Sequence, residues 1–234
     1  MSPLEAVIFD LDDTLFDHRG AASSGVREWL ADLGVSPTEA LVRLWFEAEE
    51  RHVAAWHRGE VSFWGQRRAR LREILLQIGR DDARDDRTLD QLFGDFVTRY
   101  EAAWRRFDDV IGALEMVAAA GLRVAVLTNG AELQQHRKLV AVGLAGLVGP
   151  MFCCDAIGFA KPDPRAYRHA CERLGVARER ALHVGDRYDL DVVAARAAGL
   201  AAVHLDRNRR GSHLEPSRVV SLANLEPLLH WPVV

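Results

Sequence analysis

Acidic, hydroxyl and amide side chains of this chain gather directly after three short apolar runs, and a fourth group, which contains a lysine, precedes a predicted helix. Carboxylates can hold a hard metal cation, and a lysine beside them can neutralise part of the charge of a phosphate group. Hydroxyl and amide groups can donate hydrogen bonds to phosphate oxygens. If the fold brings these groups together, they form a site for phosphate chemistry. In chain order the groups are Asp10-Leu11-Asp12-Asp13-Thr14, Thr128-Asn129-Gly130, Lys161-Pro162-Asp163-Pro164 and Gly185-Asp186-Arg187-Tyr188-Asp189-Leu190-Asp191.

A cluster of carboxylates favours a bound cation. Two unit charges about 4 Å apart repel each other by roughly 4 kcal/mol at an effective dielectric constant of about 20, and a cation between them removes this repulsion. Oxygen ligands with open positions for water suit Mg²⁺, which often pairs one or two carboxylates with a substrate phosphate. The sequence has no cysteine and histidine pattern with zinc spacing, so we expect Mg²⁺ rather than zinc.

Asp10 and Asp12 are two residues apart at the end of an apolar run. On an extended strand such side chains point to opposite faces, but they can converge where the chain begins to turn. One carboxylate of such a pair can attack phosphorus and form an aspartyl phosphate. The other can protonate the leaving oxygen and then take a proton from the water that hydrolyses the intermediate. The spacing therefore permits phosphoester hydrolysis by covalent catalysis.

The elements that must position these groups are the strands of a parallel sheet. After residue 108, strands and helices are predicted to alternate, which is typical of βαβ units and of an α/β fold: a Rossmann-like parallel sheet with helices on both faces. Ligands of such sheets bind outside the carboxyl ends of the strands, so we expect the polar groups to meet at one edge. The predicted strands are 6–9, 122–127, 151–153, 181–184 and 201–205, and the predicted helices of this part are 131–142, 164–174 and 188–198.

A long helical stretch separates the first predicted strand from the others. Over 18–105, apolar residues recur at steps of three and four, as they do on one face of a helix, and no strand is predicted. Four or so helices, one of them beginning after Ser36 as its N-cap, should form a separate bundle. We therefore expect a core domain made of 1–17 and 106–234, and a helical domain inserted at 18–105.

The composition argues against several classes of protein. The chain has 234 residues, of which 49% are hydrophobic, and its formal net charge is −4. A mildly acidic chain has no general attraction to nucleic acid or to an anionic membrane. The sequence has no apolar run of about 18 residues for a membrane span, and it does not begin like a signal peptide. Three cysteines do not make a disulfide framework, so we expect a cytoplasmic protein.

The four polar groups together resemble the sequence motifs of the haloacid dehalogenase superfamily. The order of the motifs, the apolar runs before them and the helical insertion after the first motif match as well, over essentially the whole chain. Four motifs in order are a far more specific signal than any one of them. The resemblance implies that the helical insertion is a C1-type cap, which closes over the site and selects the substrate. The matching segments are Asp10-Leu11-Asp12-Asp13-Thr14-Leu15 after Val7-Ile8-Phe9, Leu127-Thr128-Asn129-Gly130, Lys161-Pro162-Asp163-Pro164 and Gly185-Asp186-Arg187-Tyr188-Asp189-Leu190-Asp191.

The resemblance implies catalytic roles for three residues and Mg²⁺ as the cofactor. Asp10 is the expected nucleophile and a metal ligand. Asp12 is the expected general acid and base, and its main-chain carbonyl is an expected metal ligand. Lys161 is expected to bind the phosphate and to neutralise charge between it and the nucleophile.

The resemblance also implies which residues bind the phosphate and complete the metal site. The Thr128 hydroxyl and the Asn129 main-chain amide are expected to hold phosphate oxygens. Asp186 is the expected carboxylate that completes the Mg²⁺ site. Asp191 is expected to support the metal without binding it directly, with Asp189 as the competing choice.

The expected activity is Mg²⁺-dependent hydrolysis of a small phosphorylated metabolite through an aspartyl phosphate, by a monomer or homodimer. Dehalogenases of the superfamily lack the second aspartate, so Asp12 argues against that alternative. A phosphomutase needs both carboxylates, and a non-catalytic binding module can share the fold, so both alternatives stay open. A binding module would be expected to lack Asp10, Lys161 or Asp186, and all three are present.

Overall fold

The structure is a computed structural model, and it describes residues 3–80, 85–209 and 217–229. Residues 81–84, inside the predicted helical insertion, lie outside the described residues. The chain divides into two compact units. The sheet unit contains Met1–Asp17 and Arg105–Val234, and the helical unit contains His18–Trp104.

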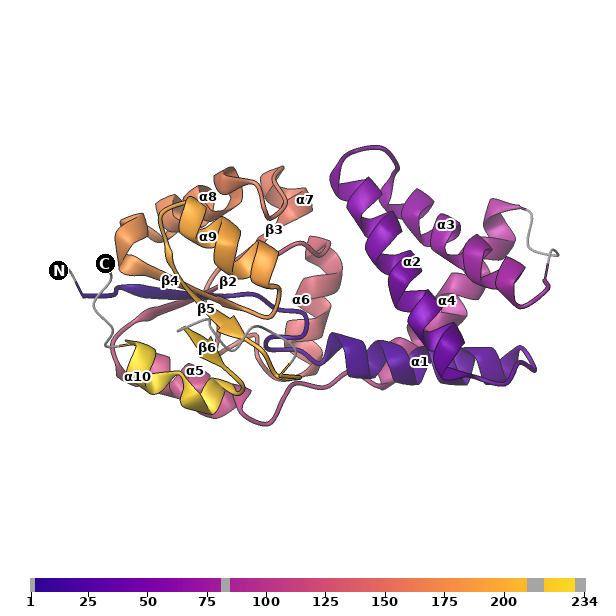
Figure 1. The fold of residues 1–234 in the computed structure, drawn as a ribbon, viewed down its shortest axis with the longest axis horizontal. Helices are drawn as coiled ribbons and strands as arrows, with labels where there is room; N and C mark the ends of the chain where they lie inside the picture. Colours follow the sequence, from indigo (N-terminus) through magenta and orange to yellow (C-terminus); the bar gives the residue numbers. More distant parts are fainter. Residues whose placement is uncertain (1–2, 81–84, 210–216, 230–234) are drawn as a thin grey trace. The chain divides into compact units, whose positions relative to one another are not determined.

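The sheet unit is built on strands that all run parallel (Figure 1). In the described part of the chain the sheet has six strands, in the order β3-β2-β1-β4-β5-β6. They are β1 (Ala6–Phe9), β2 (Arg123–Thr128), β3 (Met151–Cys153), β4 (Ala181–Gly185), β5 (Ala201–Leu205) and β6 (Arg218–Val219). This sheet confirms the predicted Rossmann-like α/β fold. β6 is not predicted from the sequence, because two residues are too few to form a pattern.

β1 lies in the middle of the sheet, and its four residues are fully buried. A strand that is buried on both faces needs apolar side chains throughout, and Ala-Val-Ile-Phe meets this requirement. β1 pairs with β2 on one side and with β4 on the other, so that Phe9 lies opposite both Val126 and Val184. The carboxyl ends of three neighbouring strands therefore reach the same edge of the sheet.

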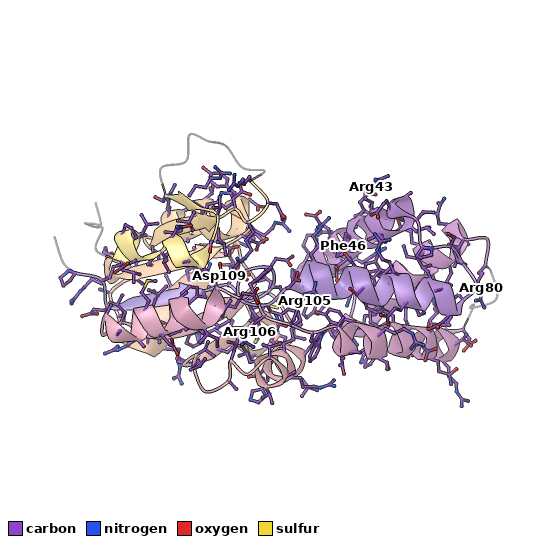
Figure 2. All side chains as sticks on the ribbon, turned by 90° about the horizontal axis from the view of Figure 1, so that it is seen from below. Arg43, Phe46, Arg80, Arg105, Arg106 and Asp109 are labelled. Atoms are coloured by element: carbon purple, nitrogen blue, oxygen red, sulfur yellow. The ribbon has the colours of Figure 1, made fainter. Side chains whose placement is uncertain are left out.

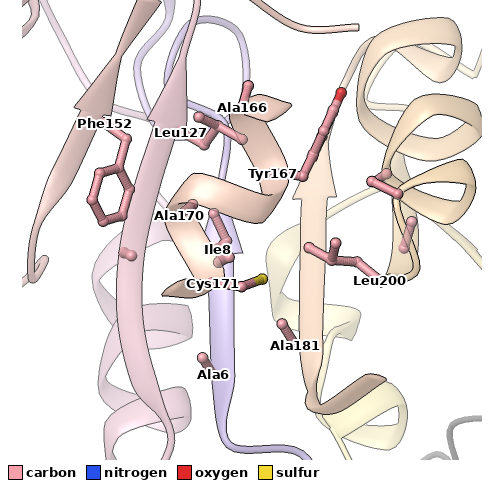
Figure 3. Packing of buried hydrophobic residues seen from close by; sticks show 14 of the residues in the cluster. Ala6, Ile8, Leu127, Phe152, Ala166, Tyr167, Ala170, Cys171, Ala181 and Leu200 are labelled. Carbon is pink, nitrogen blue, oxygen red and sulfur yellow. The ribbon is translucent and has the colours of Figure 1, made fainter. Parts of the chain in front are cut away.

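Helices cover both faces of the sheet, with α8 and α9 on one face and α5 and α10 on the other (Figure 1). Tyr167 and Ala170 of α8 belong to one buried cluster with Ile8 of β1 and Ala181 of β4 (Figure 3). This packing fixes the strands whose ends carry the polar groups. The helices of this unit are α5 (Val110–Ala119), α6 (Glu132–Ala141), α7 (Cys154–Ile157), α8 (Pro164–Leu174), α9 (Ala194–Ala197) and α10 (Glu226–Leu229), with short 3₁₀ turns at Arg178–Arg180 and Leu222–Asn224.

The helical unit has a core of its own. Trp45 is fully buried, and its ring centroid lies 4.2 Å from that of Phe96 and 5.9 Å from that of Trp29. Aromatic rings from three helices therefore fill its centre. The helices are α1 (His18–Asp32), α2 (Glu39–His57), α3 (Phe63–Gln77) and α4 (Asp86–Ala102). Among all the described helices of the chain, none combines the length and the apolar character needed to cross a membrane.

The start of α2 differs from the sequence-based expectation. Thr38, rather than Ser36, is the N-cap, and its hydroxyl accepts a hydrogen bond of 3.3 Å from the main-chain N–H of Leu41. Both residue types cap helices well, so capping preference alone does not separate them. Capping by Thr38 puts Glu39 in the first turn, where a negative charge interacts favourably with the helix dipole.

The outgoing and returning chain segments of the sheet unit lie side by side where the helical insertion begins and ends. The main-chain N–H of Asp17 donates to the carbonyl of Arg105 at 3.0 Å, and the Arg105 guanidinium binds the Asp17 carboxylate at 2.6 Å. Arg105 and Arg106 are labelled in Figure 2, in the segment that leads back to α5. A hydrogen bond and an ion pair thus join the two connections.

Candidate active site

Three aspartates meet at the edge of the sheet where β1 and β4 end. Asp10 follows β1, Asp186 follows β4, and Asp191 lies on the helical turn Tyr188–Val193. Each of the three offers a carboxylate oxygen, and these oxygens all lie within 4.8 Å of one another. Asp10 and Asp191 are buried, and Asp186 is partly buried. The structure therefore brings together residues of the first and fourth motifs, as the parallel sheet predicts.

The turn that carries Asp191 is π-helical, whereas the sequence predicts an ordinary helix over 188–198. Single π-helical turns are rare in proteins, but those that occur often lie at functional sites. The Asp191 carboxylate accepts a hydrogen bond of 2.9 Å from the main-chain N–H of Arg187 at the start of this turn. Gly185 leaves room for it, because a Cβ atom at that position would lie 2.2 Å from Cγ of Asp191. The glycine of the fourth motif is therefore required by the packing of an aspartate of the same motif.

Lys161 places an ammonium group between two of these carboxylates. Its Nζ lies 2.7 Å from Oδ1 of Asp10 and 2.6 Å from Oδ1 of Asp191, and its side chain is 2% exposed. Nε2 of His183 on β4 lies 3.0 Å from the same Asp191 oxygen. A buried charge is tolerated where opposite charges and hydrogen bonds surround it. Lys161 is therefore held in one position by the carboxylates that it neutralises.

Burial and mutual repulsion shift the pKa values of these groups. Burial raises the pKa of Asp10 to about 7, helped by the charge of Asp191 and opposed by Lys161. Burial, together with the charge of Asp10, raises the pKa of Asp186 well above its usual range. Burial acts in the same direction on Asp191, but Lys161 and His183 outweigh it and hold the pKa of that carboxyl below its usual range. The pKa values of Asp10 and Asp186 therefore stay raised as long as no metal ion is bound.

The donor atoms of this cluster fit a hard divalent cation. They are carboxylate oxygens only, which are the ligands that Mg²⁺ and Ca²⁺ prefer. The raised pKa values of Asp10 and Asp186 reflect burial and like-charge repulsion, and a cation between the two groups would relieve the repulsion. The geometry and the electrostatics of the cluster therefore agree on the kind of ion that it can hold.

Asn129 fastens the loop that carries Lys161 to the end of β2. The side-chain Nδ2 of Asn129 donates to the main-chain carbonyl of Lys161 at 2.8 Å, and the main-chain N–H of Lys161 donates to Oδ1 of Asn129 at 2.7 Å. These two bonds fix the main chain from which the lysine side chain extends. Only the main-chain amide of Asn129 is predicted from the motifs to take part in the site, so its side chain has an additional role.

Asp12 lies beside the carboxylate cluster, after the chain has turned. Asp13 has a φ angle of 62°, and its main-chain N–H donates to the carbonyl of Phe16 at 2.7 Å. The strand has therefore ended before Asp12, which removes the objection that residues 10 and 12 must point to opposite faces. The Asp12 side chain is 30% exposed, and its Oδ1 accepts a hydrogen bond of 2.6 Å from Nζ of Lys138.

Thr128 shares a hydrogen-bond partner with Asp12. The Thr128 side chain is buried, and its Oγ1 lies 2.7 Å from Nε2 of Gln135. The same Nε2 lies 2.8 Å from Oδ2 of Asp12. The threonine of the second motif and the second aspartate of the first motif are therefore joined through one side chain of α6.

The two candidate aspartates of the fourth motif have different surroundings. The Asp189 side chain is 67% exposed and lies 3.6 Å from Nε of Arg187. Asp191 is buried in the carboxylate cluster. The position of Asp191 favours it over Asp189 as the residue that supports a bound ion.

Three residues without a predicted role contact predicted site residues: Gln135, Lys138 and His183. Their relative exposures are 1%, 3% and 0%, although all three are polar. Gln135 and Lys138 lie on the buried side of α6, and His183 lies within an apolar strand. Because buried polar groups need partners, polar residues at positions where the pattern predicts burial were the available signal.

The comparisons with known proteins agree with this fold. A family model described as haloacid dehalogenase-like hydrolase matches residues 4–199. Over 198 residues, the chain is 32% identical to a phosphoserine phosphatase of Thermus thermophilus, with 84% of this chain and 75% of that protein covered. Over 214 residues, it is 28% identical to a glyceraldehyde 3-phosphate phosphatase of Methanopyrus kandleri, with 88% and 85% covered.

A solved structure gives the same result for the fold. The crystal structure of the HAD-hydrolase YfnB from Bacillus subtilis bound to magnesium matches with a TM-score of 0.84, and the match covers 97% of this chain and 99% of that one. The identity is 19%, so this match concerns the fold alone. The family model spans most of the chain, and the sheet and its motifs agree with it, so this chain belongs to the haloacid dehalogenase-like hydrolase family.

Proposed function

We propose that this chain is a Mg²⁺-dependent phosphatase that hydrolyses a small phosphomonoester through an aspartyl phosphate on Asp10. The observation that carries the proposal is the contact between Asp10 and Lys161 at the carboxylate edge of the sheet. A nucleophilic carboxylate beside a fixed ammonium group suits attack on an anionic ester, because the ammonium group offsets the repulsion between the two anions. The two phosphatases that share about 30% of its residues support the same activity.

Asp10 and Asp12 divide the reaction between them in this proposal. A carboxylate oxygen of Asp10 attacks phosphorus while the bond from phosphorus to the ester oxygen breaks, and Asp12 gives its proton to that leaving oxygen. Asp12 then takes a proton from water, the water oxygen attacks the phosphorus of the aspartyl phosphate, and Asp10 is released as a carboxylate with inorganic phosphate. Asp12 contacts Lys138 and Gln135, neither of which belongs to the carboxylate cluster, and this supports a separate role for it.

The remaining predicted residues bind the cofactor and the phosphate. We assign the Mg²⁺ ligands to Asp10, Asp186 and the main-chain carbonyl of Asp12, with Asp191 supporting the site through Lys161. When bound, the ion stabilises negative charge on the phosphoryl group during transfer. We assign the phosphate oxygens to Lys161, the Thr128 hydroxyl and the main-chain amide of Asn129. The burial of Thr128 and Lys161 supports a site from which much of the water is excluded.

We also propose that the helical insertion, 18–105, is a cap for the core made of 1–17 and 106–234, and that the cap selects a small phosphorylated metabolite. Its own aromatic core supports a domain that moves as one body. The substrates named for the two phosphatase relatives are both small phosphorylated metabolites, which supports this class. The three cysteines are free, which supports a reducing compartment such as the cytoplasm.

A phosphoester screen tests the proposed activity. The purified protein is assayed with p-nitrophenyl phosphate and a panel of sugar phosphates, nucleoside monophosphates and short phosphorylated acids, with Mg²⁺ and with chelator. We expect turnover that requires Mg²⁺ and that Asp10→Asn abolishes, while Asp12→Asn lowers kcat by about 10²-fold to 10⁴-fold. A wild-type protein that is inert toward the whole panel with Mg²⁺ would instead favour a non-catalytic binding module.

A further inference from the structure

Two polar side chains of α6, Gln135 and Lys138, are buried beside the site although neither belongs to the four motifs. Their relative exposures are 1% and 3%. Burying an amide or an ammonium group costs free energy unless hydrogen bonds or an opposite charge compensate for it. Their partners therefore indicate why these residue types occupy the buried side of the helix.

Both side chains bind the same carboxylate, one at each oxygen. Nζ of Lys138 lies 2.6 Å from Oδ1 of Asp12, and Nε2 of Gln135 lies 2.8 Å from Oδ2. The two residues are three positions apart on a helix, so they project from one face on adjacent turns. A carboxylate that is held at both oxygens cannot rotate about its χ2 bond without breaking one of these contacts.

Gln135 also determines how Thr128 uses its hydroxyl group. When Asp12 is ionised its carboxylate only accepts hydrogen bonds, so Gln135 then presents its NH₂ group to Asp12. The second hydrogen of that group points to Oγ1 of Thr128 at 2.7 Å. The main-chain N–H of Gly130 donates to the same oxygen at 3.2 Å. With two donors on its oxygen, the Thr128 hydroxyl keeps its own hydrogen to donate elsewhere.

Gly130 makes room for this arrangement. A Cβ atom at residue 130 would lie 2.2 Å from Nε2 and 2.3 Å from Cδ of Gln135. The glycine of the second motif is therefore needed to let the glutamine side chain reach both partners.

We propose that Gln135 and Lys138 are positioning residues, which fix the Asp12 carboxyl group for proton transfer and direct the Thr128 hydroxyl toward the phosphate. The inference rests on the proposed phosphatase activity. Neither residue reacts. The pair acts through Asp12 in both chemical steps, and most strongly where the leaving group or the attacking water depends on Asp12 for its proton transfer.

The first and second steps should respond differently when the pair is removed. p-Nitrophenol is a good leaving group whose oxygen needs little protonation, so phosphorylation of Asp10 by p-nitrophenyl phosphate depends weakly on Asp12. Hydrolysis of the aspartyl phosphate requires Asp12 to take a proton from water. Variants that misplace Asp12 should therefore form the intermediate and then release it slowly.

Rapid-mixing kinetics with p-nitrophenyl phosphate and saturating Mg²⁺ test the inference, with Lys138→Met and Gln135→Met as the variants. We expect a burst of about one p-nitrophenol per enzyme, followed by a steady rate about 10-fold to 100-fold below that of the wild type. KM should fall together with this rate, because slow hydrolysis of the intermediate lowers both, so kcat/KM should change little. In the Asp12→Asn background, Lys138→Met should cost almost nothing more, because the pair acts through Asp12. His136→Met, at an exposed position between Gln135 and Lys138 on α6, is the matched control and should keep the wild-type rate.

Other outcomes separate the explanations. A loss of the burst together with the steady rate, or an equal loss in the Asp12→Asn background, would mean that the pair serves the fold alone and would overturn the inference. Wild-type kinetics in both variants would also overturn it while leaving the phosphatase proposal intact, whereas an inert wild type would overturn both.

If circular dichroism shows that the methionine variants do not fold, Gln135→Glu is the replacement variant. It keeps the size of the side chain and removes the donor, and the same burst is expected. Lys138→Arg keeps a cationic donor and should restore most of the steady rate lost in Lys138→Met.

Discussion

At the scale of single residues, the site separates two aspartates of one motif by giving them different partners. Asp10 is buried and contacts Lys161 within the carboxylate cluster. Asp12 is partly exposed and contacts Lys138 and Gln135. A buried carboxylate next to other carboxylates has a raised pKa unless a cation compensates for the repulsion. The environment of Asp10 therefore suits a nucleophile and metal ligand, and that of Asp12 suits proton transfer.

The raised pKa of Asp10 makes Mg²⁺ binding depend on pH. Without a bound metal ion its pKa is about 7 in the folded protein, against an ordinary value of 3.8. The neutral form is thus favoured by folding, and the metal-free protein should lose stability as the pH rises from about 4 to about 7. Mg²⁺ needs the ionised form, so its affinity should increase between pH 5.5 and pH 8, with protons released on binding. Calorimetric titration in buffers of different ionisation enthalpy measures the Mg²⁺ affinity and the number of protons released. An affinity that does not change with pH would contradict the electrostatic account, and Asp10→Asn should flatten the dependence.

Gly185→Ala tests whether Asp191 needs the space beside β4. The added methyl group would lie 2.2 Å from Cγ of Asp191, so the carboxylate must move away from Lys161. We expect a loss of Mg²⁺-dependent turnover of at least about 10-fold, because groups that orient metal ligands typically contribute 10-fold to 100-fold. Gly112→Ala is the matched control, since no atom lies within 4 Å of its new methyl group. That variant, in α5, should keep its activity and gain about 0.5–1 kcal/mol of stability. Equal activity in both variants would contradict the proposed role of Asp191.

At the scale of elements, the ends of three neighbouring parallel strands determine the site, and side-chain hydrogen bonds attach the loops to them. β1 and β4 supply the aspartates, and the end of β2 supplies Thr128 and Asn129. Asn129 binds the main chain of Lys161 in both directions, and His183 on β4 binds Asp191. Lys161 and Asp191 lie on segments outside the strands. These hydrogen bonds hold both segments in fixed positions relative to the sheet.

Asn129→Ala should loosen the loop that carries Lys161. It removes two hydrogen bonds, of 2.8 Å and 2.7 Å, between the Asn129 side chain and the Lys161 main chain. We expect the free energy of unfolding to fall by about 1–3 kcal/mol, measured by chemical denaturation, and kcat for p-nitrophenyl phosphate to fall as well. Asn224→Ala, at an exposed position, is the control and should change neither. If Asn129→Ala lost stability but kept full kcat, the attachment would serve the fold alone.

The sequence predicts the strands and motifs well, because both are local patterns. An apolar run such as 6–9 needs no partner to be identified, and the rule that ligands bind at strand ends then predicts which residues meet. The helical pattern predicts that Gln135 and Lys138 are buried, but their partners, like the π-helical turn at Asp191, depend on tertiary contacts. The N-cap of α2 was misplaced because Ser36 and Thr38 satisfy the same local preference. The precise partners of each side chain therefore required the structure.

At the scale of the whole molecule, the chain combines a sheet unit that contains the described candidate site with a helical unit that has its own core. Each unit buries its own apolar residues, as the clusters around Ile8 and around Trp45 illustrate. Units with separate cores can differ in how much they move. This division fits the proposal that one unit carries out the chemistry and the other selects the substrate.

The most direct test of the central claim is detection of a phosphoryl group on Asp10. The Asp12→Asn variant is mixed with p-nitrophenyl phosphate and Mg²⁺, quenched in acid and reduced with borohydride, which converts an aspartyl phosphate to homoserine. Peptide mass spectrometry then locates the modified residue. The account predicts modification at residue 10 that requires both Mg²⁺ and substrate. Hydrolysis by a variant in which Asp10 is replaced by asparagine, or modification at another residue, would contradict it.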